Sequence, residues 1–445
     1  MSLDRTPTDV RTLSGVQDLL DTFRAAEKPP AEFQIGLEHE RFVYPRESSQ
    51  PVGYSGAKGI GALLTALEPA GYRPFRDSPD GPTIALTKQR LTVSLEPGGQ
   101  VELSGSPFRT AREAHAESLQ NAADLRTAAA SLGMVAVCFG YRPWGTTADM
   151  QWMPKARYAA MRQTLSSRGR LARDMMLMTC TTQVSLDWAD EADCARKVTL
   201  AARLAPLLVA LYANSPLVDG QPVGWQSYRS RVWNEVDPAR CGYFPALVDG
   251  SFSYQAYVDW ALDAPLLFLR RGGRYESPEL TFRALLANGW GGSPALASDW
   301  TDHLSTLFPE VRIKSVLEVR SADSGSVATA GALAALWRGL LYDAQALEDA
   351  GRLVPKLSFA EHLAFHAEAQ LHGLHGTLRG TPIAELARDM VRVAREGLQR
   401  LDPEDASLLE PLEETARTAR SPADVLLAAQ ARDPSPASLL AVAAL

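Results

Sequence analysis

The chain has 445 residues and a formal charge of −7, from 45 Lys and Arg against 52 Asp and Glu. That length suggests one large domain or two to three ordinary ones, and 46% hydrophobic residues are typical of a globular protein. The negative balance argues against a nucleic-acid partner, and no apolar run reaches the roughly 20 residues of a membrane-spanning helix. The first residues lack the apolar core of a secretory signal, so we expect a cytoplasmic protein.

Helices and short strands alternate through the first part of the chain. A helix is predicted over residues 10–23, and a strand follows at IGLEHERF, residues 35–42. Since side chains alternate across a strand, Glu38 and Glu40 share one face. The segment LTVSLEPGGQVELSG, residues 91–105, alternates in the same way on both sides of Pro97-Gly98-Gly99, which predicts a hairpin.

Three helices are predicted next, over residues 109–131, 155–165 and 192–213. Two further strands carry the same alternation, TTQVSLDW at residues 181–188 and SVLEVR at residues 315–320.

The character of the chain changes near residue 325, beyond which almost everything is predicted to be helical, including residues 329–349 and 383–400. We therefore expect a sheet-containing core over residues 1–325, with a helical region over 326–445 packed on the same domain.

If the strands share one antiparallel sheet, its polar face carries mostly carboxylates. The residues on this face are Glu38, Glu40, Glu96, Glu102, Gln183, Glu318 and Arg320. Any one of these glutamates is most simply a solvated residue, because antiparallel sheets often have one wet side. Together they would repel one another across strands, and glutamate is disfavoured in strands. The pattern therefore indicates a cation, and a divalent ion such as Mg²⁺ with a nucleotide suits these oxygen ligands.

Two basic segments complement the carboxylates. Lys155 and Arg157 stand at the start of a predicted helix beside Tyr158, and Arg229 and Arg231 alternate with aromatic residues in SYRSRVWNEVD. Each alone is most simply surface charge. An arginine fork beside an aromatic ring is also a common way to hold a carboxylate or phosphate. Carboxylates for a metal and arginines for anions together suggest phosphoryl transfer.

Other features carry less weight. No Walker loop or dinucleotide-binding glycine pattern is present, and the glycine-containing residues 53–61 are more simply a loop before a helix. Four histidines, His362, His366, His372 and His375, lie close together, but satisfied or exposed side chains are a better interpretation than a metal site. Four cysteines, Cys138, Cys180, Cys194 and Cys241, have no zinc or CxxC spacing, and we expect mostly buried, reduced thiols.

Several motifs occur together and in order: IGLEHERF, VSLEPGGQVELSG, MPKARYAAM, DMMLMTCTTQVSLDW, YANSPLVDG, SYRSRVWNEVDPARCG, LFPEVRIK and LEVRSAD. In this combination the chain resembles glutamate–cysteine ligase of the plant and proteobacterial type. The resemblance covers roughly residues 30–345 and continues weakly into the helical end. SLEPGGQVELSG and TCTTQVSLD are its most specific parts.

The resemblance implies an α+β fold of the glutamine synthetase and glutamate–cysteine ligase group, a curved and mostly antiparallel sheet that forms a funnel surrounded by helices. It implies ATP-dependent joining of the glutamate γ-carboxylate to the cysteine amine through a γ-glutamyl phosphate. It also implies Mg²⁺ as cofactor, ATP, L-glutamate and L-cysteine as small-molecule partners, and a monomer or homodimer.

The resemblance also assigns roles to individual residues. The metal ligands would be Glu38, Glu40, Glu96, Glu102 and Glu318. Lys155 and Glu318 would contact ATP, and Arg229 and Arg320 would be catalytic. The amino-acid substrates would contact Arg157, Tyr158, Gln183, Arg229, Arg231 and Trp233.

Several positions depart from the family pattern. Met178 replaces an arginine, Arg231 and Asn234 alter the segment around Trp233, and Ser324-Gly325-Ser326-Val327 replaces a stretch with glycine and tryptophan. These departures leave two alternatives open beside glutamate–cysteine ligase. One is a ligase of the same superfamily with another amine acceptor, and the other is a non-catalytic homologue, against which the retention of all five glutamates argues.

Overall fold

The structure is a computed structural model and describes residues 9–445. Its centre is a nine-stranded sheet in the order β14-β15-β7-β1-β5-β4-β3-β2, with β6 paired to the far part of β1. Every strand pair within it is antiparallel. The strands are β1 Ile35–Pro45, β2 Arg73–Arg76, β3 Thr83–Lys88, β4 Leu91–Leu95, β5 Val101–Ser104, β6 Met134–Val137, β7 Thr181–Leu186, β14 Val311–Ile313 and β15 Leu317–Asp323.

The alternation predicted from the sequence sets the two faces of this sheet. Leu37, Val184 and Val319 are buried in one apolar cluster on one face. Their neighbours in sequence point the other way, and the strand register places Glu40 opposite Glu102 and Glu38 opposite Gln183. The predicted hairpin is present as β4 and β5, so the mostly antiparallel sheet and the α+β fold class are confirmed.

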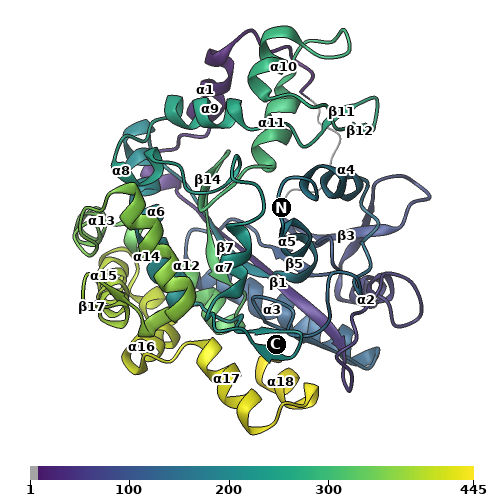
Figure 1. The fold of residues 1–445 in the computed structure, drawn as a ribbon, viewed down its shortest axis with the longest axis vertical. Coiled ribbons are helices and arrows are strands. Elements are labelled where there is room, and N and C mark those ends of the chain that lie inside the picture. Colours follow the sequence, from purple (N-terminus) through teal and green to yellow (C-terminus); the bar gives the residue numbers. More distant parts are fainter. Residues whose placement is uncertain (1–8) are drawn as a thin grey trace.

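Helices cover the apolar face of the sheet, where α12 packs against β1, β7 and α3, and α6 packs against β15. Figure 1 shows β1 as the long strand that crosses the middle of the molecule. The helices of the first part are α1 Val16–Arg24, α2 Ile60–Leu67, α3 Ala111–Ser131, α4 Ala156–Leu165, α5 Ala172–Met178, α6 Glu191–Leu211, α7 Tyr228–Trp233, α8 Ala246–Asp249, α9 Tyr254–Asp263, α10 Phe282–Asn288 and α11 Ala297–Ser305.

After β15 the chain is helical apart from a small hairpin, β16 Thr377–Leu378 with β17 Thr381–Pro382. In Figure 1 this part, green to yellow, lies along one side of the sheet. Its helices are α12 Val327–Tyr342, α13 Ala344–Ala350, α14 Phe359–His372, α15 Ile383–Leu401, α16 Glu410–Thr418, α17 Pro422–Arg432 and α18 Pro436–Ala443. The helical C-terminal part is as expected, while the boundary at 325 stays a prediction.

Two predicted helices differ from the structure. The helix expected over residues 10–23 begins only at Val16, because Leu13 N–H instead bonds to Ala295 O in a bridge to the segment before α11. The helix expected over 329–349 is split at Asp343, whose carboxylate accepts the Ala346 N–H and so starts α13. Within residues 9–445, no helix is both long and apolar enough to span a bilayer.

Candidate active site

A pocket with an empty volume of about 620 Å³ opens onto the polar face of the sheet. It brings together eight of the residues singled out from the sequence, namely Glu38, Glu40, Glu96, Glu102, Gln183, Arg229, Trp233 and Arg320. It also contains residues to which the sequence argument gave no role, namely Pro97, Gln100, Met161, Met175, Met176, Thr179, Thr181, Phe308 and Arg312.

Three carboxylates crowd the inner end of this pocket. Glu40 and Glu102 face each other across β1 and β5, and Glu96 directly follows β4, the neighbour of β5. Burial and the nearby Glu102 raise the pKa of Glu40 to about 8, and the same two causes hold the pKa of Glu96 well above its usual range. The fold therefore holds these carboxyl groups together at an electrostatic cost, and in Glu40 and Glu96 it favours the protonated form.

The inner carboxylates fit a divalent cation that is bound together with a nucleotide. Glu96 Oε1 is buried without a hydrogen-bond partner, as expected of an oxygen awaiting a cation. Within residues 9–445, however, no three His, Cys, Asp or Glu side chains form a ready chelate. Mg²⁺ commonly takes one or two carboxylates and completes its shell with water and substrate phosphates, so this incomplete donor set suits it.

Glu318 stands in a different electrostatic environment. Its carboxylate bonds to Arg312 Nε at 2.7 Å, pairs with Lys314, and lies 3.6 Å from Arg320 Nη1. Burial opposes its ionisation, but these three cations together hold the pKa of Glu318 well below its usual range. Glu318 is thus a carboxylate already neutralised by cations, unlike Glu40 and Glu96.

Arg320 extends into the pocket from β15. Its guanidinium donates to Gln183 Oε1 and lies 5.8 Å from the ring centre of Trp233 and 5.7 Å from that of Phe308. Burial and the neighbouring Arg312 lower the pKa of Arg320 to about 10, so it remains a cation at neutral pH. A cation held by an amide and two rings is well placed to meet an anionic ligand.

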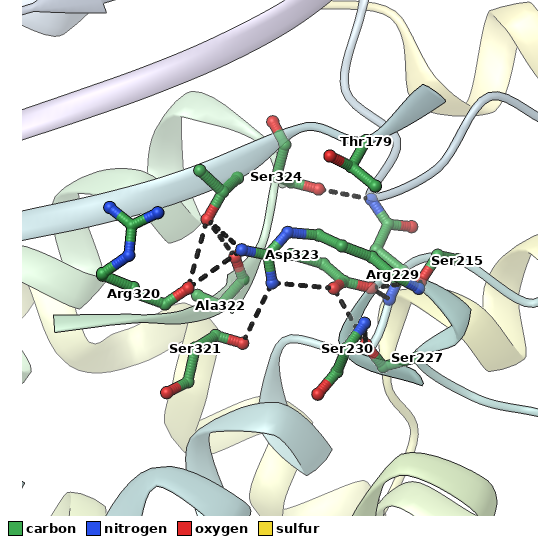
Figure 2. A network of polar contacts seen from close by, with 12 residues as sticks. Thr179, Ser215, Ser227, Arg229, Ser230, Arg320, Ser321, Ala322, Asp323 and Ser324 are labelled. Atoms are coloured by element: carbon green, nitrogen blue, oxygen red, sulfur yellow. Dashed lines mark hydrogen bonds and ion pairs between the residues drawn. The ribbon is translucent and has the colours of Figure 1, made fainter. Parts of the chain in front are cut away.

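Arg229 reaches the pocket from α7 and is only 3% exposed. Figure 2 shows its guanidinium among the main-chain oxygens of β15, beside the carboxylate of Asp323. Ser227, the N-cap of α7, accepts the Ser230 N–H and donates its hydroxyl to Asp323. The short helix and the end of β15 are therefore joined at Arg229.

The turn after Glu96 is fixed against the end of α5. Gln100 Nε2 donates to Met176 O and Thr179 O, and Arg142 donates to Gly98 O at 2.7 Å and to Leu177 O at 3.2 Å. A glycine is required at position 98, because a Cβ there would lie 2.8 Å from Leu177 Cα. These contacts set the position of Glu96.

The segment at the start of α4 lies beside the pocket and does not line it. The Lys155 ammonium is 5.4 Å from the centre of the Tyr158 ring, and its charge acts on Glu96. Tyr158 donates to Leu95 O at 2.5 Å, whereas Arg157 lies over the Phe268 ring. Lys155 is thus related electrostatically to the carboxylates.

The pocket is lined by none of the positions that depart from the family pattern, namely Met178, Arg231, Asn234 and residues 324–327. Met178 is fully buried in the apolar cluster behind the site, and Asn234 donates to Gln370 on α14. Arg231, predicted to bind substrate, instead pairs with Glu235 and lies over the Trp225 ring.

The four histidines do not form one group. His362 and His366 are buried on α14 beside Tyr243, while His372 and His375 are exposed and lie near Glu368 and Asp424. Residues 53–59 form a loop that leads into α2, as expected, and residues 53–61 do not line the pocket.

The pocket residues that were missed come mainly from two places. Arg312 and Phe308 lie in LFPEVRIK. In that segment Arg312 and Lys314 alternate with apolar residues next to a strand, and this pattern could have indicated that they belong to the polar face. Met161, Met175 and Met176 come from α4 and α5, where a helical pattern gives no sign of which face meets a ligand.

A second hollow adjoins the first at Glu38. This groove, with an empty volume of about 780 Å³, runs along the outer part of the same polar face. Gly36, Gly105, Lys28, Arg90 and Asp187 are among its lining residues. Glu38 is the lining residue that the pocket and the groove share.

Comparison with known proteins agrees with this geometry. The model of glutamate–cysteine ligase family 2 matches residues 34–441. The chain is 36% identical over 419 residues to the chloroplastic glutamate–cysteine ligase of Brassica juncea, covering 92% of this chain and 80% of the relative. It is 32% identical over 415 residues to the chloroplastic glutamate–cysteine ligase B of Oryza sativa subsp. japonica, covering 92% and 83%.

Two solved structures share the fold. A crystal structure of glutamate–cysteine ligase from Francisella tularensis in complex with AMP has a TM-score of 0.57 at 12% identity, covering 92% of this chain and 87% of that one. A bifunctional glutathione synthetase from Pasteurella multocida has a TM-score of 0.51 at 12% identity, covering 97% and 53%.

Proposed function

Since the chain belongs to glutamate–cysteine ligase family 2 and catalyses ATP-dependent formation of γ-glutamylcysteine, we propose which residues of its pocket bind the metal and each substrate. The observation that carries the proposal is the meeting of buried carboxylates and arginines in one pocket. Such a site suits transfer of a phosphoryl group between two anions, which needs positioning and neutralised charge.

Mg²⁺ is the proposed cofactor, with Glu40, Glu96 and Glu102 at the inner end of the pocket and Glu38 with Glu318 nearer the groove. When bound, it would neutralise the phosphates of ATP and relieve the repulsion among the inner carboxylates. Glu38 acts electrostatically on both Lys314 and Arg320, which places it beside the Glu318 cluster. Of the two sets, the inner carboxylates suit the cation better, because Glu318 is already paired with Arg312 and Lys314.

We place the nucleoside of ATP in the groove and its phosphates toward Glu38, because the groove and the pocket share that residue. Gly36, which has no side chain, would leave room for a flat base or a ribose. Lys155, beside Glu96, is the proposed contact of the phosphates at the inner end, and the Glu318 cluster is the proposed contact nearer the groove.

The two amino acids would then share the inner pocket. Arg229, Arg312 and Arg320 supply positive charge for carboxylates and for the acyl phosphate. Met161, Met175 and Met176 with Trp233 and Phe308 form an apolar wall that suits the short side chain of cysteine.

The residues of the chain support each chemical stage. The glutamate γ-carboxylate attacks the γ-phosphorus of ATP and ADP leaves, which gives an acyl phosphate. The cysteine amine then attacks the acyl carbon, phosphate departs, and the amine loses its proton. Arg320, held by Gln183, is positioned to stabilise the negative charge that moves onto phosphate. The apolar wall helps to exclude water, which would hydrolyse the acyl phosphate.

The structure gives no reason to expect another amine acceptor. Met178, Arg231 and Asn234, which suggested that alternative, all lie away from the pocket surface. The direct test measures ADP release with ATP, Mg²⁺ and glutamate, in the presence of cysteine or of a panel of other small amines, with product masses. Cysteine-dependent γ-glutamylcysteine supports the assignment. Turnover only with another amine would revive the alternative acceptor, and no turnover would favour a non-catalytic homologue.

We also propose that the protein works in a reducing compartment, the cytoplasm. The four cysteines are all free thiols, and three are buried, which supports this view. The plant relatives bear the word chloroplastic in their names, so cell fractionation of the native protein is the test.

A further inference from the structure

The end of β15 is interrupted where it carries Arg320. Val319 pairs with Val184 and Ala322 pairs with Thr182, so Arg320 and Ser321 together stand opposite the single residue Gln183. This two-to-one pairing is a β-bulge, which breaks the ladder locally and re-aims a side chain. The main-chain oxygens of the bulge therefore need partners from outside the sheet.

Arg229 supplies those partners. Its Nη2 donates to Arg320 O at 2.9 Å and to Thr181 Oγ1 at 2.8 Å, and its Nη1 donates to Ser321 O at 3.4 Å. The guanidinium therefore binds the main chain of the bulge, directly behind the side chain of Arg320. Any displacement of Arg229 would be passed to Arg320 through these oxygens.

Asp323, in turn, holds Arg229. Its carboxylate has no exposed surface and accepts the Asn214 N–H at 2.8 Å and the hydroxyls of Ser215 and Ser227 at 2.6 and 2.9 Å. Arg229 Nη1 lies 3.7 Å from Asp323 Oδ1, and Figure 2 shows the two groups side by side. Ser215 also accepts the Arg229 N–H at 3.0 Å, so backbone and side chain are both fixed.

We propose that Asp323 is a positioning residue for Arg320, acting through Arg229 and the bulge. A buried guanidinium that loses its counter-ion is strongly disfavoured and moves toward other negative charge. Asp323 thus keeps Arg229 on the bulge and Arg320 aimed at the reacting phosphate. The inference rests on the role proposed for Arg320.

The test is Asp323→Asn, which keeps the shape of the side chain and removes its charge. We expect kcat with saturating glutamate, cysteine and ATP to fall about 10- to 100-fold, because a displacement of about 1 Å at a reacting group costs on that order. The KM for ATP should differ from that of the wild type by no more than about twofold, because the proposed nucleoside groove and the bulge lie on opposite sides of Glu38. Ser215→Ala, a milder change, should reduce kcat about 3- to 10-fold and serves if Asp323→Asn does not fold.

Asp405→Asn is the matched control. Asp405 is also fully buried, pairs with Arg338 at 2.9 Å and accepts the N–H groups of Ala111 and Arg112, but it joins α3 to α12 away from the pocket. Its loss should lower the thermal midpoint and leave kcat unchanged. An Asp323→Asn enzyme, or failing that a Ser215→Ala enzyme, with the kcat of the wild type would overturn the inference.

A double-mutant cycle separates this inference from the role of Arg320 itself. If Asp323 acts through Arg320, Asp323→Asn costs no further activity in an Arg320→Ala enzyme. A purely structural role would give an additional loss there, which would contradict the inference. If Arg320→Ala alone retains wild-type turnover, the proposed role of Arg320 fails, and this inference fails with it for that separate reason.

Discussion

Carboxylates on one face of the sheet have pKa values shifted in opposite directions. Glu318 is ionised because three cations surround it, while Glu40 and Glu96 have raised pKa values because they are buried beside Glu102. A carboxylate that is costly to ionise lowers the stability of the ligand-free fold at neutral pH. We attribute this cost to the need for a cation that arrives with the nucleotide.

Glu96→Gln should therefore stabilise the ligand-free protein while it weakens catalysis. Without a charge to bury, we expect the free energy of unfolding at neutral pH to rise by about 1–3 kcal/mol. Turnover should fall about 100-fold or more, because even the loss of a residue that only orients a metal ligand costs about 10- to 100-fold in activity. Urea unfolding and steady-state kinetics check both. The control is Glu68→Gln at an exposed position, and lower stability in Glu96→Gln would contradict the argument.

Gly36→Val should narrow the groove without straining the sheet. A Cβ at position 36 would meet only Ser185 Cβ, at 3.5 Å, and valine suits a strand. If the nucleoside lies there, the KM for ATP should rise about 10-fold or more, while the KM for glutamate changes little. Initial-rate kinetics with each substrate varied in turn decide the matter. A selective rise in the KM for glutamate would place the nucleoside elsewhere.

Among the elements, the turn at residues 96–100 depends on its neighbour α5. The Gln100 side-chain amide donates to the Met176 and Thr179 carbonyls at the end of that helix, and Arg142 donates to both Gly98 O and Leu177 O. These bonds satisfy carbonyl groups that a helix end leaves open. The position of Glu96 is thus set by an element more than seventy residues away in sequence.

Gly98→Ala should separate this turn from α5. The new Cβ would crowd the main chain of Leu177, so the turn must shift. We expect a stability loss of about 1–3 kcal/mol and a fall in kcat of about 10-fold or more, as Glu96 moves with the turn. Gly15→Ala, where a Cβ meets nothing within 4 Å, is the control and should change neither quantity. Unaltered kcat in Gly98→Ala would show that the turn tolerates displacement.

The helices α12 and α15 approach closely where Gly339 meets Gly397. A Cβ on Gly339 would lie 3.0 Å from the carbonyl carbon of Ala394, and one on Gly397 would meet the main chain of Gly339. Gly339→Ala should therefore force the helices apart and lower stability by about 1–3 kcal/mol, despite the better helix propensity of alanine. Thermal unfolding measures the loss. The KM values of the folded enzyme should not change, and a more stable variant would contradict this packing.

At the scale of the whole molecule, stability depends on buried neutral histidines as well as on the site. His303 on α11 bonds to Ala261 O at 2.7 Å, and burial, with Arg240 nearby, lowers its pKa from 6.5 to about 3. Between those pH values the unfolded chain binds a proton that the folded chain does not. This group therefore contributes less stability as the pH falls through 6.5.

His303→Gln isolates that contribution. Between about pH 7 and about pH 5, the wild type should lose about 2 kcal/mol at this site that the variant does not lose, from 1.36 kcal/mol for each unit of pKa difference. The gap in unfolding free energy between the two proteins should narrow accordingly when urea titrations are compared. A gap that is constant across this pH range would mean that His303 has the same pKa in the fold as in the unfolded chain. Because only the gap is compared, the opposite pH dependence of Glu40 and Glu96 cancels.

The sequence predicted the local pattern of the sheet well and the limits of some helices poorly. The alternation of polar and apolar residues around Glu38 and Glu102 was enough to assign the two faces of their strands, because the side chains of a strand alternate residue by residue. The helix expected over 10–23 begins later than predicted, because its first residues instead form a β-bridge with residues 295–296. No local sequence pattern predicts that contact. The helix expected over 329–349 is divided at Asp343, because the Asp343 side chain caps the start of a new helix there.

The sequence by itself determined the carboxylate face, the sheet that carries it and the family to which the chain belongs, since these depend on local periodicity and on motif order. Only the tertiary structure decided that Arg312 neutralises Glu318, that Arg320 donates to Gln183, and that Asp323 reaches Arg229. Most of these contacts join separate elements of the chain. Their geometry depends on how whole elements pack, and a pattern within one element contains no information about that packing.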